Sequence, residues 1–242
     1  MKSKLLILLF LLVTSFCWAQ NSSFWDGIEA FDGPTDDNPV LAAQLDFYFD
    51  KMVAPLPDSI TKEIDRLIER TSFNTDLRDF ILWHLLEKYR HPEYMNQDQM
   101  FVWLYDRYFS QLEIKDLNST NLSLIKEKAE RLRRLALLNT APDFMLNDTL
   151  DLQSVESEYT VLFFYDHSCD VCRQEMQDLD SITIQRPEIK IIDIDMNTDD
   201  THVDVLYNLY DIETTPLIYV LDRDKRIIAK KIRAKKIPLI II

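Results

Sequence analysis

Residues 159–176 read Tyr-Thr-Val-Leu-Phe-Phe-Tyr-Asp-His-Ser-Cys-Asp-Val-Cys-Arg-Gln-Glu-Met, and this stretch decides the fold. The run Thr160–Tyr165 is β-branched and aromatic, which is typical of a buried strand. A short polar turn follows, and after it the apolar residues recur at helical spacing. Cys169 and Cys172 therefore lie where a predicted strand ends and a predicted helix begins.

This placement favours thiol chemistry at the first cysteine. Unpaired N–H groups and the dipole at a helix N-terminus stabilise an anion, and the thiolate is the nucleophile of thiol–disulfide exchange. We expect Cys169 to attack a disulfide and Cys172, one turn into the helix, to resolve the mixed disulfide. Asp170 is expected to disfavour the neighbouring thiolate slightly, which favours a reductant or isomerase over a strong oxidant.

A Cys-x-x-Cys pair is also half of a structural zinc site. Such a site takes about four ligands. The third cysteine of the chain, Cys17, lies in a predicted leader, and the nearest further candidate ligand is His167. The ligand count argues against zinc, and we predict neither a metal nor another bound cofactor.

Several motifs follow one another in order between Ala141 and Ile232. They are Ala141-Pro142-Asp143-Phe144, the strand, Cys169-x-x-Cys172, Glu175, the strand Ile189–Asp195, and Thr214-Thr215-Pro216 with the strand after it. Together they resemble the thioredoxin-like fold of the TlpA-like periplasmic thiol–disulfide oxidoreductase type. The resemblance implies an α/β domain with a mixed sheet. It also implies a cis Pro216 facing the cysteine pair and a Thr215 backbone that pairs with an extended substrate chain.

The sequence departs from this family at three places. Ser168 stands where tryptophan is usual, and the residues between the cysteines are Asp-Val rather than Gly-Pro or Pro-Pro. Phe163 stands where thioredoxin has a buried acid. The proton acceptor for Cys172 therefore stays open between Glu175 and a water molecule.

The first nineteen residues resemble a secretory signal peptide. Lys2 and Lys4 precede an unbroken apolar run, Leu5–Val13, and the apolar stretch is shorter than the ~20 residues that span a bilayer. An uncleaved anchor is the alternative, and the bulky Phe16 argues against a lipid anchor at Cys17. We predict export to the periplasm, a compartment where disulfides form, and no membrane span after cleavage.

Residues 20–139 predict a helical domain. Apolar residues recur at helical spacing within 40–52, 60–68, 74–89, 97–111 and 122–138. The predicted chain is thus α+β, with a helical bundle over 20–139 and a thioredoxin-like domain over 140–242. The first part resembles a helical domain of unassigned function that precedes thioredoxin-like domains in exported bacterial proteins, and we expect it to dock partners or present substrates.

The C-terminus predicts no closing helix. From Lys235 the chain reads Lys-Lys-Ile-Pro-Leu-Ile-Ile-Ile, which is too short for the helix of the family and is interrupted by Pro238. We expect a truncated or frame-shifted end that leaves apolar sheet exposed.

Composition excludes several function classes. A formal net charge of −14 makes a poor partner for nucleic acid or anionic membranes, and two glycines leave no glycine-rich phosphate loop. The leading hypothesis is an exported oxidoreductase that reduces or reshuffles protein disulfides, with a membrane reductase as its electron donor.

Two alternatives stay open at this point. The motif Ala-Pro-Asp-Phe also opens peroxiredoxins, which resemble one another in a Thr-x-x-Cys pattern. In this chain the residue three positions before Cys169 is Asp166, and the residue three positions before Cys172 is Cys169, so the threonine is missing at both places. The other alternative is a non-catalytic binding module that uses the helical domain, with the cysteine pair structural or copper-binding.

Overall fold

The computed structural model describes residues 24–28, 33, 38–92, 94–197 and 201–241, with only the backbone described at 201 and 202. The predicted signal peptide and Cys17 lie outside these residues. The chain divides into two compact units. The first holds the described residues before Pro92 together with Asp106–Leu117, and the second holds Pro92–Tyr105 and Asn118–Ile242.

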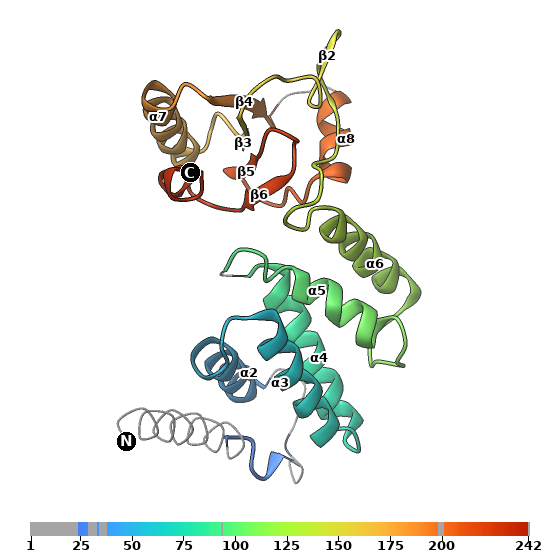
Figure 1. Cartoon of the computed structure of the whole chain (residues 1–242). Coiled ribbons are helices and arrows are strands. Elements are labelled where there is room, and N and C mark those ends of the chain that lie inside the picture. Colours follow the sequence, from blue (N-terminus) through green and yellow to red (C-terminus); the bar gives the residue numbers. More distant parts are fainter. Residues whose placement is uncertain (1–23, 29–32, 34–37, 93, 198–200, 242) are drawn as a thin grey trace, which may run out of the picture. The chain divides into compact units, whose positions relative to one another are not determined.

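The first unit consists of helices (Figure 1), and the residues that they bury are mostly apolar. Its elements are α2 (Pro39–Phe47), a π-helical turn η2 (Tyr48–Met52), α3 (Pro57–Arg70), α4 (Thr75–Arg90) and most of the π-helical turn η3 (Tyr105–Phe109). Asn38 and Asn74 cap α2 and α4, since each side-chain oxygen accepts a hydrogen bond from a backbone N–H three residues on. Helix formation in this part of the chain is confirmed.

The second unit contains two further helices ahead of its sheet. They are α5 (Gln99–Leu104) and α6 (Ser119–Arg134), the latter capped by Asn118. Sequence analysis placed both in the helical domain, with a boundary at residue 139. The compact units group them with the sheet instead, and the boundary between independently folding domains stays a prediction.

The sheet is mixed, as predicted. Its four strands are β3 (Tyr159–Tyr165), β4 (Ile189–Asp195), β5 (Leu217–Leu221) and β6 (Ile227–Lys230), in the order β4-β3-β5-β6. Strand β3 is parallel to β4 and antiparallel to β5, and β5 is antiparallel to β6. The short hairpin β1 (Met145–Asn147) and β2 (Leu150–Asp151) forms a separate two-stranded sheet.

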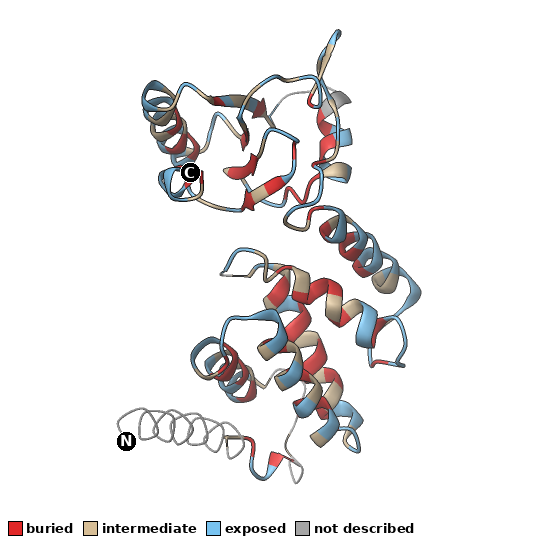
Figure 2. Cartoon of the chain, viewed as in Figure 1, coloured by how far each residue is buried: buried red, intermediate tan, exposed pale blue. Residues whose placement is uncertain are grey.

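Helices cover the two faces of this sheet. Helix α7 (Asp170–Gln185) connects β3 to β4 on one face, and α8 (Thr201–Leu209) lies on the other (Figure 1). The buried residues of α7 are Cys172, Glu175 and Leu179, whose spacing of three and four puts them on one side of the helix, and the burial along the chain is shown in Figure 2. Because both faces are covered, β3 is a continuous apolar run rather than an alternating one.

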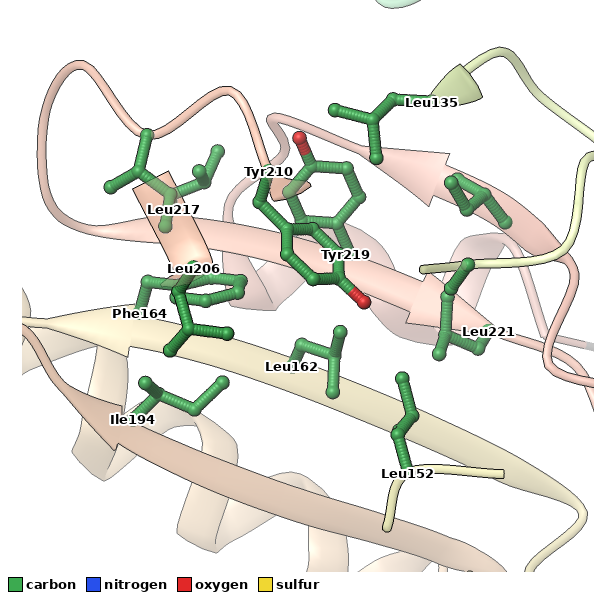
Figure 3. Packing of buried hydrophobic residues seen from close by; sticks show 13 residues of the cluster. Leu135, Leu152, Leu162, Phe164, Ile194, Leu206, Tyr210, Leu217, Tyr219 and Leu221 are labelled. Carbon is green, nitrogen blue, oxygen red and sulfur yellow. The ribbon is translucent and has the colours of Figure 1, made fainter. Parts of the chain in front are cut away.

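Two apolar cores fill the space on either side of the sheet. On the α8 side, Leu162 and Phe164 of β3 pack with Leu206, Tyr210 and Tyr219 (Figure 3). On the α7 side, the alternate residues of the same strand, Val161 and Phe163, pack with Cys172 and Leu179. The site residue Cys172 is therefore part of a packed core.

The C-terminal segment forms a short 3-10 helix, η4 (Ala234–Leu239), on the α7 side of the sheet. Ala234, Ile237 and Ile241 are buried there. The expectation that the tail leaves this face exposed is wrong, because six residues with 3-10 geometry accommodate Pro238 and still place Ala234 and Ile237 against the core.

Candidate active site

The turn between β3 and α7 is built by contacts between near neighbours. The Oδ1 atom of Asp166 accepts hydrogen bonds from the backbone N–H of Ser168 at 2.6 Å and from its hydroxyl at 2.7 Å. The carbonyl oxygen of Asp166 accepts from the N–H of Cys169 at 3.1 Å. This turn ends the strand and places Cys169 at the N-cap of α7, as predicted.

Cys169 caps the helix with its sulfur atom. Its Sγ accepts the backbone N–H of Cys172 at 3.1 Å, and the side chain is half-buried. The hydrogen bond to the Cys172 side chain, with those from the Cys172 and Val171 backbones, lowers the pKa of Cys169, while burial and the charge of Asp166 oppose this. A thiol with a lowered pKa at a helix N-terminus is a reactive nucleophile.

Cys172 has the opposite environment. Its side chain is buried in the core beside α7. Burial raises the pKa of the Cys172 thiol, and the hydrogen bond to Cys169 raises it further. Both cysteines are free thiols. The pair is therefore asymmetric, with a half-exposed thiol of lowered pKa at the helix end and a buried thiol of raised pKa behind it.

The loop before β5 faces the first cysteine. The Thr215–Pro216 peptide bond is cis, which confirms the conformation implied by the resemblance. The carbonyl oxygen of Thr215 lies 3.9 Å from the Sγ of Cys169. The structure thus brings Thr215 and Pro216 to the cysteine pair, and their part in substrate binding stays a prediction.

Glu175 is held by the C-terminal segment. One carboxylate oxygen accepts the backbone N–H of Ala234 at 2.6 Å, and the other lies 3.1 Å from a guanidinium nitrogen of Arg233. These contacts fasten the start of η4 to α7. They give Glu175 a structural role that the sequence did not indicate, and its predicted part in proton transfer stays a prediction.

Asp170 forms an exposed ion pair within α7. Its carboxylate pairs with Arg173, one turn further along α7, and is strongly exposed. The carboxylate whose charge raises the Cys169 pKa is that of Asp166. The structure thus adds Asp166 as a second carboxylate that disfavours the thiolate, and the expected effect of Asp170 stays a prediction.

No metal-binding cluster accompanies the cysteines. The Nε2 atom of His167 lies 2.7 Å from a carboxylate oxygen of Asp195, at the end of the neighbouring strand β4. Within the described ranges, no group of three or more His, Cys, Asp and Glu side chains has a geometry that could hold a metal ion.

Several charged residues that sequence analysis did not predict surround Asp211, at the start of the segment that leads to the cis Pro216 (the cis-proline loop). Asp211 is almost completely buried and contacts Lys128 of α6 and Lys231, which follows β6. Spacing could not indicate these contacts, since Lys128 and Asp211 are 83 residues apart. The one available signal was an isolated lysine on the otherwise apolar side of α6.

Comparison with known proteins agrees with this geometry. Residues 137–235 match the model of the AhpC/TSA family. A thioredoxin-like protein from Bacteroides caccae superposes with a TM-score of 0.68 at 16% identity, covering 88% of this chain and 87% of its own. Residues 137–235 form a thioredoxin-like domain. The superposition covers more of the chain than this domain, so the likeness in fold extends into the helical part.

Two further solved structures match a smaller part of the chain. A domain of a possible thiol-disulfide isomerase from Cytophaga hutchinsonii is 27% identical, covers 43% of this chain and 89% of its own, and has a TM-score of 0.36. The thioredoxin domain of a thiol-disulfide oxidoreductase from Bacteroides vulgatus is 20% identical, covers 41% and 90%, and has a TM-score of 0.35. No curated protein matches the chain.

The described helices of this protein are all too short or too polar to cross a membrane.

Proposed function

We propose that this protein is an exported thiol–disulfide oxidoreductase that reduces or reshuffles disulfides of other proteins through Cys169 and Cys172. The observation that carries the proposal is the asymmetry of the two thiols. Cys169 is half-exposed with a lowered pKa, whereas Cys172 is buried with a raised pKa. Exchange enzymes need this division between an attacking and a resolving thiol.

The reaction begins at the thiolate of Cys169. Its sulfur attacks one sulfur of the substrate disulfide, so that a mixed disulfide forms and the substrate's other sulfur leaves as a thiolate, which takes up a proton. Cys172 then loses its proton and attacks the Sγ of Cys169. The Cys169–Cys172 disulfide forms, and the second substrate thiolate leaves. Two electrons have passed from the protein to the substrate.

Return to the dithiol requires a second thiol partner. A reduced dithiol of a donor protein gives two electrons to the Cys169–Cys172 disulfide by the same exchange in reverse, and we assign this donor to a membrane reductase. No bound cofactor takes part in these steps. Export is supported by the pattern of residues 1–19, and the periplasm is a compartment in which protein disulfides form.

Release of the substrate requires a proton acceptor for Cys172. Burial raises the pKa of the Cys172 thiol, so this thiol stays protonated until the proton acceptor removes its proton. Both oxygens of Glu175 already have partners in the C-terminal segment. A water molecule reaching the mixed disulfide is therefore the better supported of the two acceptors.

The proposal is tested by the redox equilibrium of the full chain without residues 1–19. The protein is incubated across a glutathione series, free thiols are alkylated, and the oxidised fraction is measured. We expect a reversible two-electron transition between about −120 and −270 mV, the span of known exchange enzymes. A pair that stays oxidised below about −300 mV would be a structural disulfide and would contradict the proposal.

A second measurement separates the proposal from a peroxiredoxin. Insulin reduction by the dithiol form is followed in parallel with hydrogen peroxide consumption. We expect insulin reduction, and peroxide consumption no faster than that of a variant with Cys169 replaced by serine. Cys169-dependent peroxide turnover without insulin reduction would assign the chain to peroxide chemistry instead.

A further inference from the structure

The segment that leads into the cis-proline loop begins with a buried carboxylate. The side chain of Asp211 is 1% exposed, and its two oxygens lie 2.9 Å from the Nζ of Lys128 and 2.8 Å from the Nζ of Lys231. Burial alone would raise the pKa of Asp211, but the charges of the two lysines outweigh it and lower the pKa to about 2. Asp211 is thus an ionised anchor inside the thioredoxin-like domain.

Lys128 binds a second carboxylate further along the same segment. Its Nζ lies 2.6 Å from an oxygen of Glu213, and it also lies 5.9 Å from the centre of the Phe101 ring. The Lys128 side chain is only 5% exposed. One buried ammonium group therefore holds two carboxylates that are two residues apart in the chain.

The contacts of Lys128 hold a stretch whose side chains are only partly buried. Ile212 and Leu217 are buried, while the residues between them are exposed or half-buried. This short stretch contains Thr215 and the cis Pro216, and the Thr215 carbonyl lies 3.9 Å from the Sγ of Cys169. Its position depends on polar contacts because few of its side chains enter the core. The Lys128–Glu213 ion pair is one such contact, two residues before Thr215.

Moving the cis-proline loop away from α6 would cost free energy, because Lys128 would lose its charged partners. If Glu213 and Asp211 moved away, an ammonium group would stay buried without its partners, which is strongly unfavourable. Lys128 is on α6, ahead of the residues that match the AhpC/TSA family, and α6 belongs to the same compact unit as the sheet. Helix α6 thus acts as a part of the scaffold of the cis-proline loop.

We propose that Lys128 is a positioning residue for the substrate-binding loop, and that its bonds to Asp211 and Glu213 place the Thr215 backbone to pair with an extended segment of a protein substrate. The inference rests on the proposed function. It gives the helical part of the chain a definite task, which is to set the affinity of the redox site for polypeptide disulfides. Small disulfides, which have no extended chain to pair with Thr215, do not depend on this task.

The test compares two variants with matched controls in the full chain without residues 1–19. Lys128→Met removes the buried ammonium, and Glu213→Ala removes the outer carboxylate while leaving the Lys128–Asp211 pair in place. Lys126→Met and Glu130→Ala are the controls, because these residues form an exposed ion pair on the same helix. Insulin gives the KM and kcat for a polypeptide, and a small aromatic disulfide reports the intrinsic reactivity of Cys169.

We expect both test variants to raise the KM for insulin about tenfold, within the loss of up to ~10²-fold that misplacement of a positioning group can cause. The rate with the small disulfide should stay within about twofold of the parent chain, because that substrate does not use the loop. Unchanged insulin KM in folded variants would reduce Lys128 to a stabilising residue and overturn the inference. An equal loss with both disulfides would also overturn it, since Lys128 would then act on the cysteines.

Backbone amide exchange decides the same question without any activity. Exchange of the backbone amides of residues 213–215 and 217 should speed up about tenfold in Lys128→Met relative to Lys126→Met, because the loop opens locally more often. Unchanged exchange in this segment would overturn the inference even if activity were lost. Conversely, a parent chain that reduces no protein disulfide would refute the proposed function, and the exchange rates would still show whether Lys128 positions the loop.

Discussion

The two segments that meet at the redox site are held in different ways. The cysteine turn, residues 166–172, is shaped by hydrogen bonds between residues two or three positions apart. The cis-proline segment, residues 211–216, is held by Lys128 across 83 and 85 residues and by Lys231 across 20. The position of Cys169 is therefore set by local structure, and the position of the loop opposite is set by the tertiary fold.

This difference separates reactivity from recognition. Local hydrogen bonds and the helix end lower the pKa of Cys169, and a substitution far away in the chain leaves them intact. The loop opposite depends on buried charges contributed by α6 and by Lys231. Substitutions at the turn should thus change the chemistry of the thiol, whereas substitutions at the buried charges should change the stability of the fold and the binding of polypeptides.

The largest effect is expected at the cysteines themselves. Cys169→Ser removes the nucleophile and should lower insulin reduction by at least ~10³-fold, because the weak hydroxyl nucleophile cannot replace the thiolate. Cys172→Ser keeps the attack but not the resolution, so it should accumulate a mixed disulfide that mass spectrometry detects. Insulin reduction at the parent rate in Cys172→Ser, or a mixed disulfide on Cys172 in Cys169→Ser, would contradict the assigned roles.

The second-largest effect is expected at the buried carboxylate of Asp211. Asp211→Asn leaves Lys231 and Lys128 short of a charged partner and should lower the free energy of unfolding by about 3 kcal/mol, as for other broken buried ion pairs. Urea unfolding at pH 7 measures the change. Asp224→Asn, in an exposed turn, is the matched control and should stay within about 0.5 kcal/mol of the parent chain.

The lowered pKa of Asp211 also predicts how the free energy of unfolding depends on pH. Its pKa falls from 3.8 in an ordinary setting to about 2 in the folded protein. The stabilisation is therefore complete above pH 4 and lost as the pH falls towards 2, which amounts to about 2 kcal/mol. The difference between the parent chain and Asp211→Asn should narrow over this range. A constant difference from pH 5 to pH 2 would show that Asp211 is not the titrating group.

A moderate effect is expected where the C-terminal segment joins α7. Glu175→Ala leaves the buried N–H of Ala234 without its acceptor and should cost about 1–3 kcal/mol of unfolding free energy. Thermal unfolding measures this loss. The pH dependence of Cys169 alkylation should be unchanged, and a marked shift in it would instead support Glu175 as the proton relay. Glu156→Ala, an exposed residue of the same domain, serves as the control.

The smallest effect is expected from the carboxylates of the cysteine turn. Asp166→Asn removes the charge that raises the Cys169 pKa while keeping an acceptor for Ser168, so that pKa should fall by less than about one unit. Asp170→Asn should change it less, because Asp170 is paired with Arg173. The rate of iodoacetamide alkylation against pH measures the Cys169 pKa in both variants. A larger shift of this pKa in Asp170→Asn than in Asp166→Asn would show that Asp170 is the carboxylate that disfavours the thiolate, as the sequence predicted.

Patterns within short stretches were enough to predict much of the fold. The apolar run of β3 and the helical spacing after Cys172 are local signals, and both elements form where they were expected. The motif Thr214-Thr215-Pro216 indicated the cis bond through its family resemblance. In the same way, the mixed sheet followed from the order of motifs along the chain.

The sequence by itself thus determined the strand–cysteine–helix unit, since this unit depends on neighbouring residues, and the family resemblance indicated the mixed sheet. Tertiary structure decided what surrounds that unit. It brought Lys128 to Asp211 and Glu213, directed Glu175 to Ala234, and packed η4 on the face expected to be bare. The physical reason is that a buried charge takes whichever partner the fold supplies, and partners separated by tens of residues leave no periodic trace in the sequence.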